Sequence, residues 1–509
     1  MAEPSAKILR RTLDQTLHGE ADNIDRLSVL PESVLLSILS RLDLKEAAAT
    51  SVLSTAWRDL FLNLPYVQLN FNGNGNPPDH PRLFHLFTLF INRILRERNP
   101  EIPIKAFWLT VKNFTERMKL DYNSLMMSIA AAMSTCKMMT IDYAIGSCSE
   151  GTEVSSLPLP PAMFMSETLT RLRLTLSVGW DLPENVWMPN LRYAYFIPYR
   201  LTHENSTQRF LDGCPRLDCL MFTIRATPTR DEPRVKTLRV SSSSLRVLRV
   251  GWDPIGERGM SINVKSESLE RLILYLRGGH NVNVDAPNLK FLDICGHVLQ
   301  MNIIRGFPLI DEAVIDVAYA AQGTYWKDFH ADTKKASTFF KELQNVRVLS
   351  VSEPIIKALF VHANELPTFS NMYKIKFIPD YSLDEFTRNG IQDVFFNLFQ
   401  RCPNLQVLSF HDKIDMLSSS NVFDIELETV FPITMVQNLK ELQISEFKGE
   451  QMEYMLLKFF LKNGQSLQII SLRKDASKKA GRYTWPRKQK KKILSFRRKC
   501  TKECEIIFK

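Results

Sequence analysis

The sequence lacks most of the patterns that mark enzymes and membrane proteins. No run of about 18 apolar residues occurs among its 509 positions, so nothing is expected to span a bilayer. The first 20 residues hold no apolar run with a small-residue cleavage site, so no secretory signal is expected. The nine histidines never pair at the i, i+4 spacing of a zinc-protease helix, and G-x-S-x-G and Walker motifs are absent. We therefore expect no catalytic activity and no cofactor.

Cysteine is also scarce, and its eight residues are poorly spaced for metal binding. The close pairs are Cys214 with Cys219 and Cys500 with Cys504, and neither has a C-x-x-C spacing or a matching histidine pair downstream. Reduced thiols are the ordinary state of a cytosolic or nuclear protein. The sequence thus predicts no metal site and a location in the nucleus, the cytoplasm or both.

The net charge of +10 comes from one end of the chain. Residues 474–509 contain 14 Lys or Arg residues against 3 Asp or Glu residues, which leaves the remainder nearly neutral. The basic cluster between Arg487 and Lys499 has three interpretations: a solvated face of a last helix, a nuclear import signal, or a nucleic-acid patch. Nucleic acid is disfavoured as a partner, because only Tyr483, Trp485 and Phe496 lie nearby to stack on bases.

The densest apolar pattern lies in residues 25–60. Pro31 suits the first turn of a helix. The apolar residues that follow it share one face at three- and four-residue steps: Val34, Leu35, Ile38, Leu39 and Leu42. A second helix is expected from Lys45, and a third is expected to carry Val52, Leu53, Trp57 and Leu60. About 40 residues are too few to bury a sufficient core alone, so another chain or the next domain should cover some of this surface.

This stretch resembles an F-box of the plant form. The matching motifs are Asp25-Arg26-Leu27-Ser28, Leu30-Pro31, Ile38-Leu39-Ser40-Arg41-Leu42, Ala48, Thr50-Ser51-Val52-Leu53-Ser54 and Trp57-Arg58. One departure is Thr55-Ala56, where the family usually carries basic residues. The resemblance implies docking on a Skp-type adaptor and, through it, on a cullin-based ubiquitin ligase. The alternative is an ordinary amphipathic helical cap on a larger domain.

We predict that eleven residues of this F-box-like stretch contact the adaptor. They are Leu27, Leu30, Pro31, Leu35, Ile38, Leu39, Leu42, Val52, Leu53, Trp57 and Arg58. Beyond them, a loop rich in Gly and Pro is expected at 73–81. A further helix should follow, and its shared apolar face is predicted to consist of Leu83, Leu86, Phe87, Phe90, Ile94 and Leu95.

The rest of the chain repeats a short apolar pattern in which positions one, four and six are apolar. Copies begin at Ile104, Met138, Leu169, Leu191, Leu217, Leu245, Leu269, Leu289, Glu312, Val346, Met372, Leu405, Leu439 and Leu467. Their spacing of 20 to 34 residues is typical of leucine-rich repeats, which alternate one strand with a returning loop or helix. The apolar positions should face a shared core, and positions three and five should face the concave side of the sheet.

In this register, a group of Arg and aromatic residues projects from adjacent strands on the concave side. The predicted client-binding residues are Arg171, Arg173, Tyr193, Tyr195, Arg249, Arg271, Tyr275 and Phe291, with Met221 and Asp293 beside them. Arg and aromatic side chains are frequent anchors of protein interfaces. The alternative is that these are simply solvent-facing strand residues.

Two further segments extend the family resemblance. The stretches 210–217 and 398–405 both predict a helix end, a Cys-Pro turn and a strand, as in plant F-box leucine-rich-repeat proteins, with Cys214 and Cys402 as small buried apolar residues. From Asn438 the order of strand, helix, strand, basic helix and last strand resembles the FBD module that often closes such proteins. The predicted domains are a disordered tail (1–23), an F-box (24–70), a repeat solenoid (71–435) and an FBD-like unit (436–509).

Taken together, these patterns predict an α/β fold: a helical F-box, an irregular leucine-rich-repeat solenoid and an FBD-like C-terminal unit. The resemblance implies a non-catalytic substrate-recognition subunit of a Skp-cullin-F-box ubiquitin ligase. It would bind the adaptor through the F-box and a client protein through the repeats. Two alternatives remain open: a receptor in which a small molecule completes the client surface, and a repeat scaffold that binds protein or nucleic acid without ligase assembly.

Overall fold

The structure is a computed structural model, and it describes most of the chain. The described residues are 30–72, 79–132, 136–145, 159–180, 182–199, 204–224, 236–252, 260–276, 280–296, 301–316, 329–352, 355–356, 359, 365–378, 391–411, 426–474, 485–496 and 504–509. The predicted tail, Leu27 and the basic residues 497–499 lie outside them. The chain divides into two compact units, residues 1–153 and 154–509, here called the N-terminal and C-terminal units. The predicted domain boundaries stay predictions.

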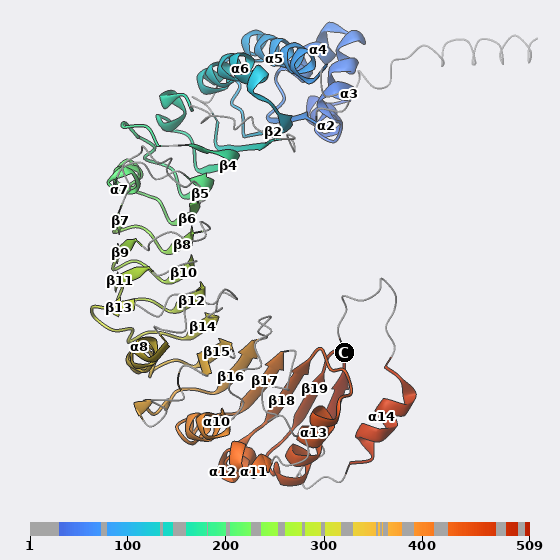
Figure 1. Cartoon of the computed structure of the whole chain (residues 1–509). Coiled ribbons are helices and arrows are strands. Elements are labelled where there is room, and N and C mark those ends of the chain that lie inside the picture. Colours follow the sequence, from blue (N-terminus) through green and yellow to red (C-terminus); the bar gives the residue numbers. More distant parts are fainter. Residues whose placement is uncertain are drawn as a thin grey trace, which may run out of the picture. The chain divides into compact units, whose positions relative to one another are not determined.

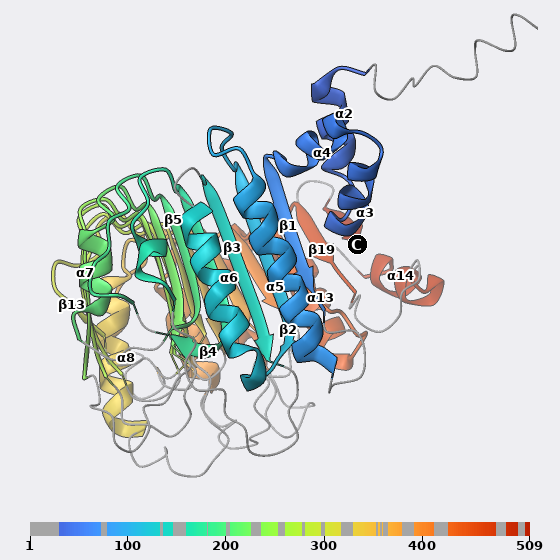
Figure 2. The same cartoon turned by 90° about the horizontal axis from the view of Figure 1, so that it is seen from above.

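The N-terminal unit combines a helical cluster with three parallel strands. Its elements are α2 (Glu32–Leu39), α3 (Leu44–Ala49), η1 (Thr50–Val52), α4 (Thr55–Leu62), β1 (Tyr66–Phe71), α5 (His80–Glu97), β2 (Ala106–Phe114), η3 (Glu116–Met118), α6 (Lys119–Ala132) and β3 (Met138–Ile145). Strands β1, β2 and β3 pair in that order. Helices α5 and α6 lie side by side along them (Figure 2) and are joined by hydrogen bonds from Asn92 to Ser124 and between His85 and Asp121.

Local capping explains where the short F-box helices begin. The Asp43 carboxylate accepts from the backbone N–H of Glu46 at 2.7 Å, and Glu46 accepts from Asp43 at 3.2 Å, which forms a capping box at the start of α3. The Ser54 hydroxyl accepts from the Trp57 N–H at the start of α4. Three helices occur where the pattern predicted them, but Leu42 lies after α2, and Val52 and Leu53 lie before α4, in η1 and the turn that follows it.

The predicted helix is confirmed as α5, but most of its predicted apolar face is not buried, with Ile94 as the exception. The buried side chains are His80, Phe84, Thr88, Ile91 and Ile94, while Leu83, Leu86 and Phe90 are exposed. Apolar residues occupy much of this helix's circumference, so their spacing alone could not select the inward side. Aromatic contacts select it, because Phe84 packs on Phe71 of β1 and on Phe114 of β2, with ring centroids 5.2 and 5.9 Å apart.

The C-terminal unit is built from parallel strands that pair in chain order. Its elements are η5 (Pro161–Phe164), β4 (Arg171–Trp180), β5 (Tyr193–Tyr199), α7 (Ser206–Asp212), β6 (Cys219–Ile224), β7 (Thr237–Ser241), β8 (Val247–Trp252), β9 (Ser261–Lys265), β10 (Arg271–Leu276), β11 (Asn281–Asp285), β12 (Phe291–Gly296), β13 (Met301–Ile303), β14 (Glu312–Asp316), α8 (Phe329–Glu342), β15 (Val348–Ser352), β16 (Lys374–Ile378), α10 (Ile391–Gln400), β17 (Val407–His411), α11 (Leu427–Val430), α12 (Ile433–Asn438), β18 (Glu441–Ser445), α13 (Gln451–Asn463), β19 (Ile469–Leu472), α14 (Arg487–Leu494) and β20 (Glu505–Phe508). Helices α7, α8, α10, α12 and α13 lie on one side of the repeat strands (Figure 1).

The predicted repeat register is confirmed for most copies. In the copy that begins at Leu245, the first, fourth and sixth residues (Leu245, Leu248 and Val250) are buried, and Arg249 is exposed. Two copies were placed two residues too late. The residue in the first position is Cys136 rather than Met138, and Ile310 rather than Glu312, since Cys136 and Ile310 are the buried residues at that position.

In the most closely spaced repeats, the segment that connects one strand to the next is neither the loop nor the helix that was predicted. Strands β8, β10, β12 and β14 begin 20 to 24 residues apart, which leaves little room for a helix between them. The chain returns instead through β7, β9, β11 and β13, which form a second parallel sheet of four strands. Where the strands are farther apart, as between β16 and β17, a helix (α10) forms the return.

The Cys-Pro junctions and the C-terminal order of elements are confirmed. Helix α7 ends at Asp212, and Cys214 is buried in the turn before β6. A side chain at Gly213 could not fit there, because a Cβ atom would lie 2.2 Å from the Val186 carbonyl oxygen. Helix α13, its cap at Gly464, and strands β19 and β20 occur where the pattern placed them. No helix in the described ranges is both long and apolar enough to cross a membrane.

Candidate functional site

Three of the predicted adaptor-binding residues form the inner core of the F-box helices instead. Leu35, Leu39 and Trp57 are almost fully buried, and they pack in one cluster with Ala47, Phe61, Leu64 and Ile94. A partner could not reach these side chains without unfolding the cluster. Their assignment as direct contacts is therefore corrected: they hold the helices in place, since apolar spacing does not distinguish the inside of a small domain from its binding surface.

Other predicted adaptor residues are on the surface. Val52 is 87% exposed and Leu53 is 62% exposed, both at the turn between α3 and α4. Leu42 is 36% exposed, Pro31 is exposed, and Leu30 and Ile38 are partly buried. Val34, which was not among the predicted contacts, is 41% exposed on α2. A nearly bare Val-Leu pair on a rigid turn is the kind of apolar surface that another protein covers.

Arg58 is held against α5. Its guanidinium group donates to Glu97 at 2.9 Å, and Glu97 also accepts from Arg93 at 2.8 Å. Hydrogen bonds from Arg93 and then Arg58 lower the pKa of the Glu97 carboxyl. These side chains are largely exposed, so the pairs contribute little stability. They do direct the Arg58 side chain toward α5.

Among the described residues, the helices of the C-terminal unit lie on one side of its repeat strands, and the opposite side is here called the open sheet face. All eight predicted client-binding residues lie on it at third, fifth or seventh repeat positions. Three guanidinium groups stack on aromatic rings across neighbouring strands. Arg173 lies 4.8 Å from the Tyr195 ring centroid, Arg249 lies 4.7 Å from Tyr275, and Arg271 lies 3.8 Å from Phe291. Arg171 pairs in register with Tyr193.

Hydrogen bonds extend this group of side chains. The Tyr275 hydroxyl donates to the Asp293 carboxylate at 3.1 Å, and burial raises the pKa of both groups. The Tyr193 hydroxyl lies 3.9 Å from the Met221 sulfur. The predicted register thus brings the residues together as neighbours on β4, β5, β8, β10 and β12.

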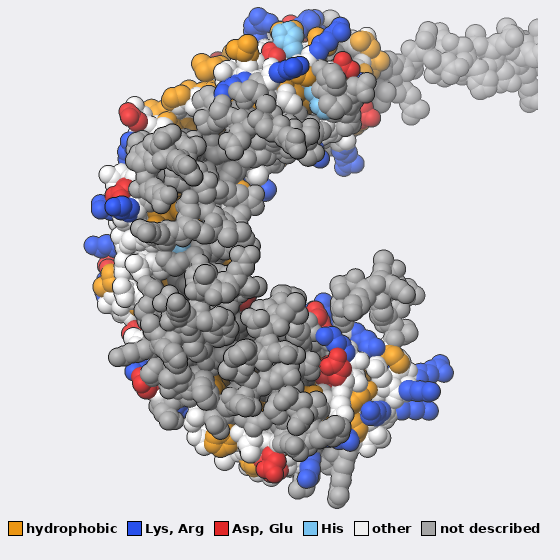
Figure 3. Space-filling view, viewed as in Figure 1, with side chains coloured by type: hydrophobic (Ala, Val, Ile, Leu, Met, Phe, Trp, Pro, Cys, Tyr) orange, Lys and Arg blue, Asp and Glu red, His pale blue; other side chains and the backbone are white. Residues whose placement is uncertain are grey.

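The basic C-terminal helix packs against the molecule through one apolar residue and several aromatic rings. Ile493 of α14 is fully buried, whereas Leu494 is 51% exposed. Lys492 lies 3.6 Å from the Tyr454 ring centroid, and Lys490 lies 5.1 Å from Phe508. Figure 3 shows Lys and Arg side chains gathered over α14. Nearby aromatic rings therefore serve internal packing, which disfavours base stacking by them.

Thiols and carboxylates offer little chemistry in the described part of the chain. Burial raises the pKa of Cys214 and of Cys402 to about 12, so both thiols stay protonated near neutral pH. This agrees with their predicted role as small apolar residues. Within the described ranges, no group of three His, Cys, Asp or Glu side chains is arranged to hold a metal ion.

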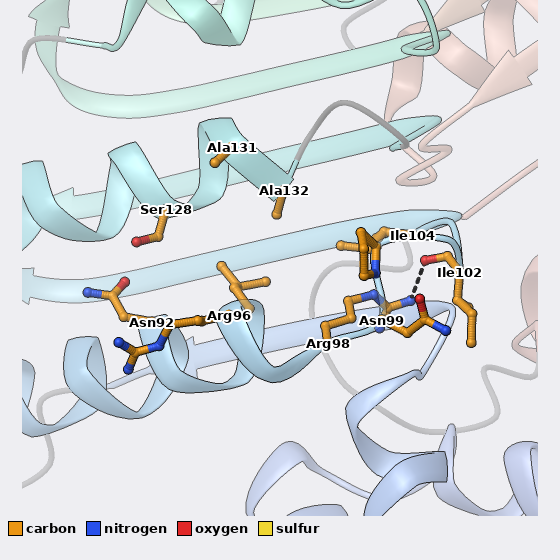
Figure 4. A pocket seen from close by; sticks show the side chains of 11 residues that line it. Asn92, Arg96, Arg98, Asn99, Ile102, Ile104, Ser128, Ala131 and Ala132 are labelled. Atoms are coloured by element: carbon orange, nitrogen blue, oxygen red, sulfur yellow. Dashed lines mark hydrogen bonds between the residues drawn. The ribbon is translucent and has the colours of Figure 1, made fainter.

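Two hollows occur away from the open sheet face. One, of about 260 Å³, lies between the C-terminal ends of α5 and α6 in the N-terminal unit. Its lining includes Asn92, Arg96, Asn99, Ile104 and Ser128 (Figure 4). The other, of about 480 Å³, follows the turns before β8, β10 and β12 and is lined mainly by polar and charged side chains.

Comparison with known proteins agrees with this architecture. The F-box domain family matches residues 27–68, and the leucine-rich repeats of the FBD-associated F-box protein At5g56370 match residues 148–309. The chain is similar over most of its length to three proteins of Arabidopsis thaliana. FBD-associated F-box protein At5g27750 is 24% identical over 88% of this chain and 92% of its own length.

The other two relatives are aligned over a larger share of the chain. F-box/FBD/LRR-repeat protein At5g22660 is 25% identical over 95% of this chain and 96% of its own length. Putative F-box/FBD/LRR-repeat protein At5g22670 is 26% identical over 95% of this chain and 97% of its own length. The predicted resemblance is thus confirmed: the chain carries an F-box domain and FBD-associated leucine-rich repeats, and it is similar over most of its length to plant F-box/FBD/LRR-repeat proteins.

Proposed function

We propose that this chain is the substrate-recognition subunit of a Skp-cullin-F-box ubiquitin ligase. The F-box would hold a Skp-type adaptor, and the open sheet face would hold a client protein. The observation that carries the proposal is the exposed Val52-Leu53 pair on an F-box whose own core is complete without a partner. In this role the chain supplies proximity rather than bond chemistry, because linking two binding modules raises the effective concentration of client and ubiquitin carrier.

The adaptor contact can be tested with surface substitutions. Changing Val52 and Leu53 to Asp in the full chain should abolish capture by a purified Skp-type adaptor, because both side chains would place a charge in a desolvated interface. Folding should be nearly unaffected, since both residues are exposed. Capture is measured by pull-down, and folding by circular dichroism and thermal unfolding.

Two control variants are measured in the same pull-down. The Leu35→Asp, Leu39→Asp variant places charges in the buried cluster, and it should lose adaptor capture together with the folded F-box. The Arg93→Gln variant alters an exposed residue of α5 and should bind like the parent chain. If the Val52→Asp, Leu53→Asp variant binds the adaptor as the parent chain does, the proposed contact surface is wrong; if the parent chain does not bind, so is the ligase assignment.

We also propose that the predicted client-binding residues of the open sheet face contact a client protein. Arg173, Arg249 and Arg271, each stacked on an aromatic ring, form a pre-organised surface, which lowers the entropy lost when a partner binds. The two hollows described above lie away from this face, so neither of them supports a small-molecule receptor there.

A further inference from the structure

The open sheet face changes in charge along the row of strands. From β4 to β10 its described residues include four arginines (Arg171, Arg173, Arg249 and Arg271) and no carboxylate. The next strands are acidic, with Asp293 on β12 and with Glu312 and Asp316 on β14. An anionic ligand would therefore be attracted to β4–β10 and repelled at β12 and β14.

We infer that the β4–β10 part of this face binds an extended, acidic segment of the client protein. This inference rests on the proposed function, since it names the chemistry of the client that the repeats would hold. Arg271 and Arg249 use their flat faces on Phe291 and Tyr275, at 3.8 and 4.7 Å. The N–H groups of a guanidinium lie in its plane, so this stacking leaves an edge suited to a carboxylate.

The strand order sets the spacing of the acidic residues. Strand β4 is separated from β8 by β5 and β6, and Arg173 is in register with Arg249, so these two lie about 14 Å apart across the sheet, at about 4.8 Å per strand. Arg171 is in register with Arg271 one strand farther, at about 19 Å. A segment that crosses the strands in an extended form covers these spans in about four to six residues, at about 3.3 Å per residue.

The surface between the arginines indicates what lies between the acidic residues. Tyr195 and Met221 are adjacent in register and partly exposed, and Cys219 and Val247 lie beside them. These side chains form an apolar surface. A polar side chain of the client would be buried against it without a hydrogen-bond partner, which is unfavourable. The segment is thus expected to carry an aromatic or aliphatic residue between two acidic residues that are four to six positions apart.

The test uses the full chain and a library of nine-residue peptides. Each peptide has two Glu residues, one to six positions apart, and one Phe residue between them or, at the shortest spacing, beside them. Binding should be strongest at separations of four to six. The Arg171→Gln, Arg249→Gln, Arg271→Gln variant should bind these peptides at least tenfold more weakly. An Arg→Lys variant at the same positions should fall between, because Lys keeps the charge but not the paired N–H groups.

A matched control removes three positive charges elsewhere in the same unit. Lys236, Arg239 and Lys265 lie on or beside strands of the second sheet, and their change to Gln should alter peptide binding less than twofold. Equal loss in this control, or equal binding of peptides with Gln in place of Glu, would overturn the inference. Peptides with phosphoserine in place of Glu separate the two sources of negative charge: tighter binding supports a phosphorylated segment, and weaker binding supports a carboxylate one.

Adaptor capture by the same variants separates this inference from the proposed function. The Arg→Gln variant should still bind the Skp-type adaptor, because its substitutions lie in the C-terminal unit. If the parent chain captured no adaptor but bound the acidic peptides, the ligase role would fail while the peptide surface stood. If it captured the adaptor but none of the peptides, the acidic-segment inference would fail alone.

Discussion

Arg98 shows how a single side chain can join the F-box helices to the elements that follow them. It is 8% exposed, and its guanidinium group donates to the carbonyl oxygens of Leu62, Leu64 and Ile102 at 2.9, 2.8 and 3.2 Å. The carbonyls of Leu62 and Leu64 lie at and just after the C-terminal end of α4, where the helix dipole favours a positive charge. Figure 4 shows Arg98 beside the hollow, directed toward Ile102. Burial lowers the pKa of this group, yet an arginine stays charged at neutral pH.

We predict that Arg98→Met destabilises the N-terminal unit by about 2–4 kcal/mol, because it leaves several buried carbonyl oxygens without a donor. Hydrogen exchange of residues 55–72 in the full chain should become faster. The matched control is Arg93→Met, which removes an exposed arginine of the same helix and should cost less than about 1 kcal/mol. Equal exchange rates in the two variants would show that Arg98 does not join these elements.

At the scale of elements, the second sheet of the C-terminal unit carries a row of hydrogen-bonded amides. Asn263, Asn283 and Asn302 occupy matching positions on β9, β11 and β13. The Asn283 amide donates to Asn263 at 2.6 Å, and the Asn302 amide donates to Asn283 at 3.0 Å. Asparagine ladders of this kind stabilise stacked parallel strands in register. The row thus compensates for the low β-propensity of Asn itself.

The ladder predicts an ordered series of stabilities. Asn283→Ala breaks two amide hydrogen bonds and should lower the free energy of unfolding by about 1–2 kcal/mol, whereas Asn302→Ala breaks one and should cost about half as much. Alanine is a fair replacement, because Ala and Asn both have low strand propensity. Urea unfolding of the full chain measures the difference. Equal losses for both variants would mean that the central amide has no special role.

For the whole molecule, the compartment is still a proposal. We propose that the chain works in the nucleus, the cytoplasm or both, where its buried cysteines would remain reduced. A fluorescent fusion in plant cells should show this distribution, and a secretory pattern would contradict it.

Changing the exposed Lys488 and Lys491 of α14 to Gln separates two interpretations of the basic segment. A lower nuclear share would support an import signal, and an unchanged share would support a solvated helix face.

The repeat strands, the family resemblance and the side of the sheet on which the proposed client-binding residues lie could all be predicted from the amino-acid sequence. Alternation with a period of two places Arg249 on one face and Leu248 on the other, and no tertiary contact is needed to see this. The F-box motifs were equally readable, since their residues are contiguous. The Cys-Pro junctions were also predictable, because they are local turns that follow a helix end.

Which apolar residues are buried could be seen only in the three-dimensional structure. Leu35 and Val52 are both apolar F-box residues, yet Leu35 is buried against Trp57 and its neighbours, and Val52 is bare. The inward face of α5 was set in the same way, by the rings of β1 and β2. The returning strands depended on the space between close repeats. In each case the physical reason is that burial depends on residues distant in the sequence, whose positions a local pattern does not contain.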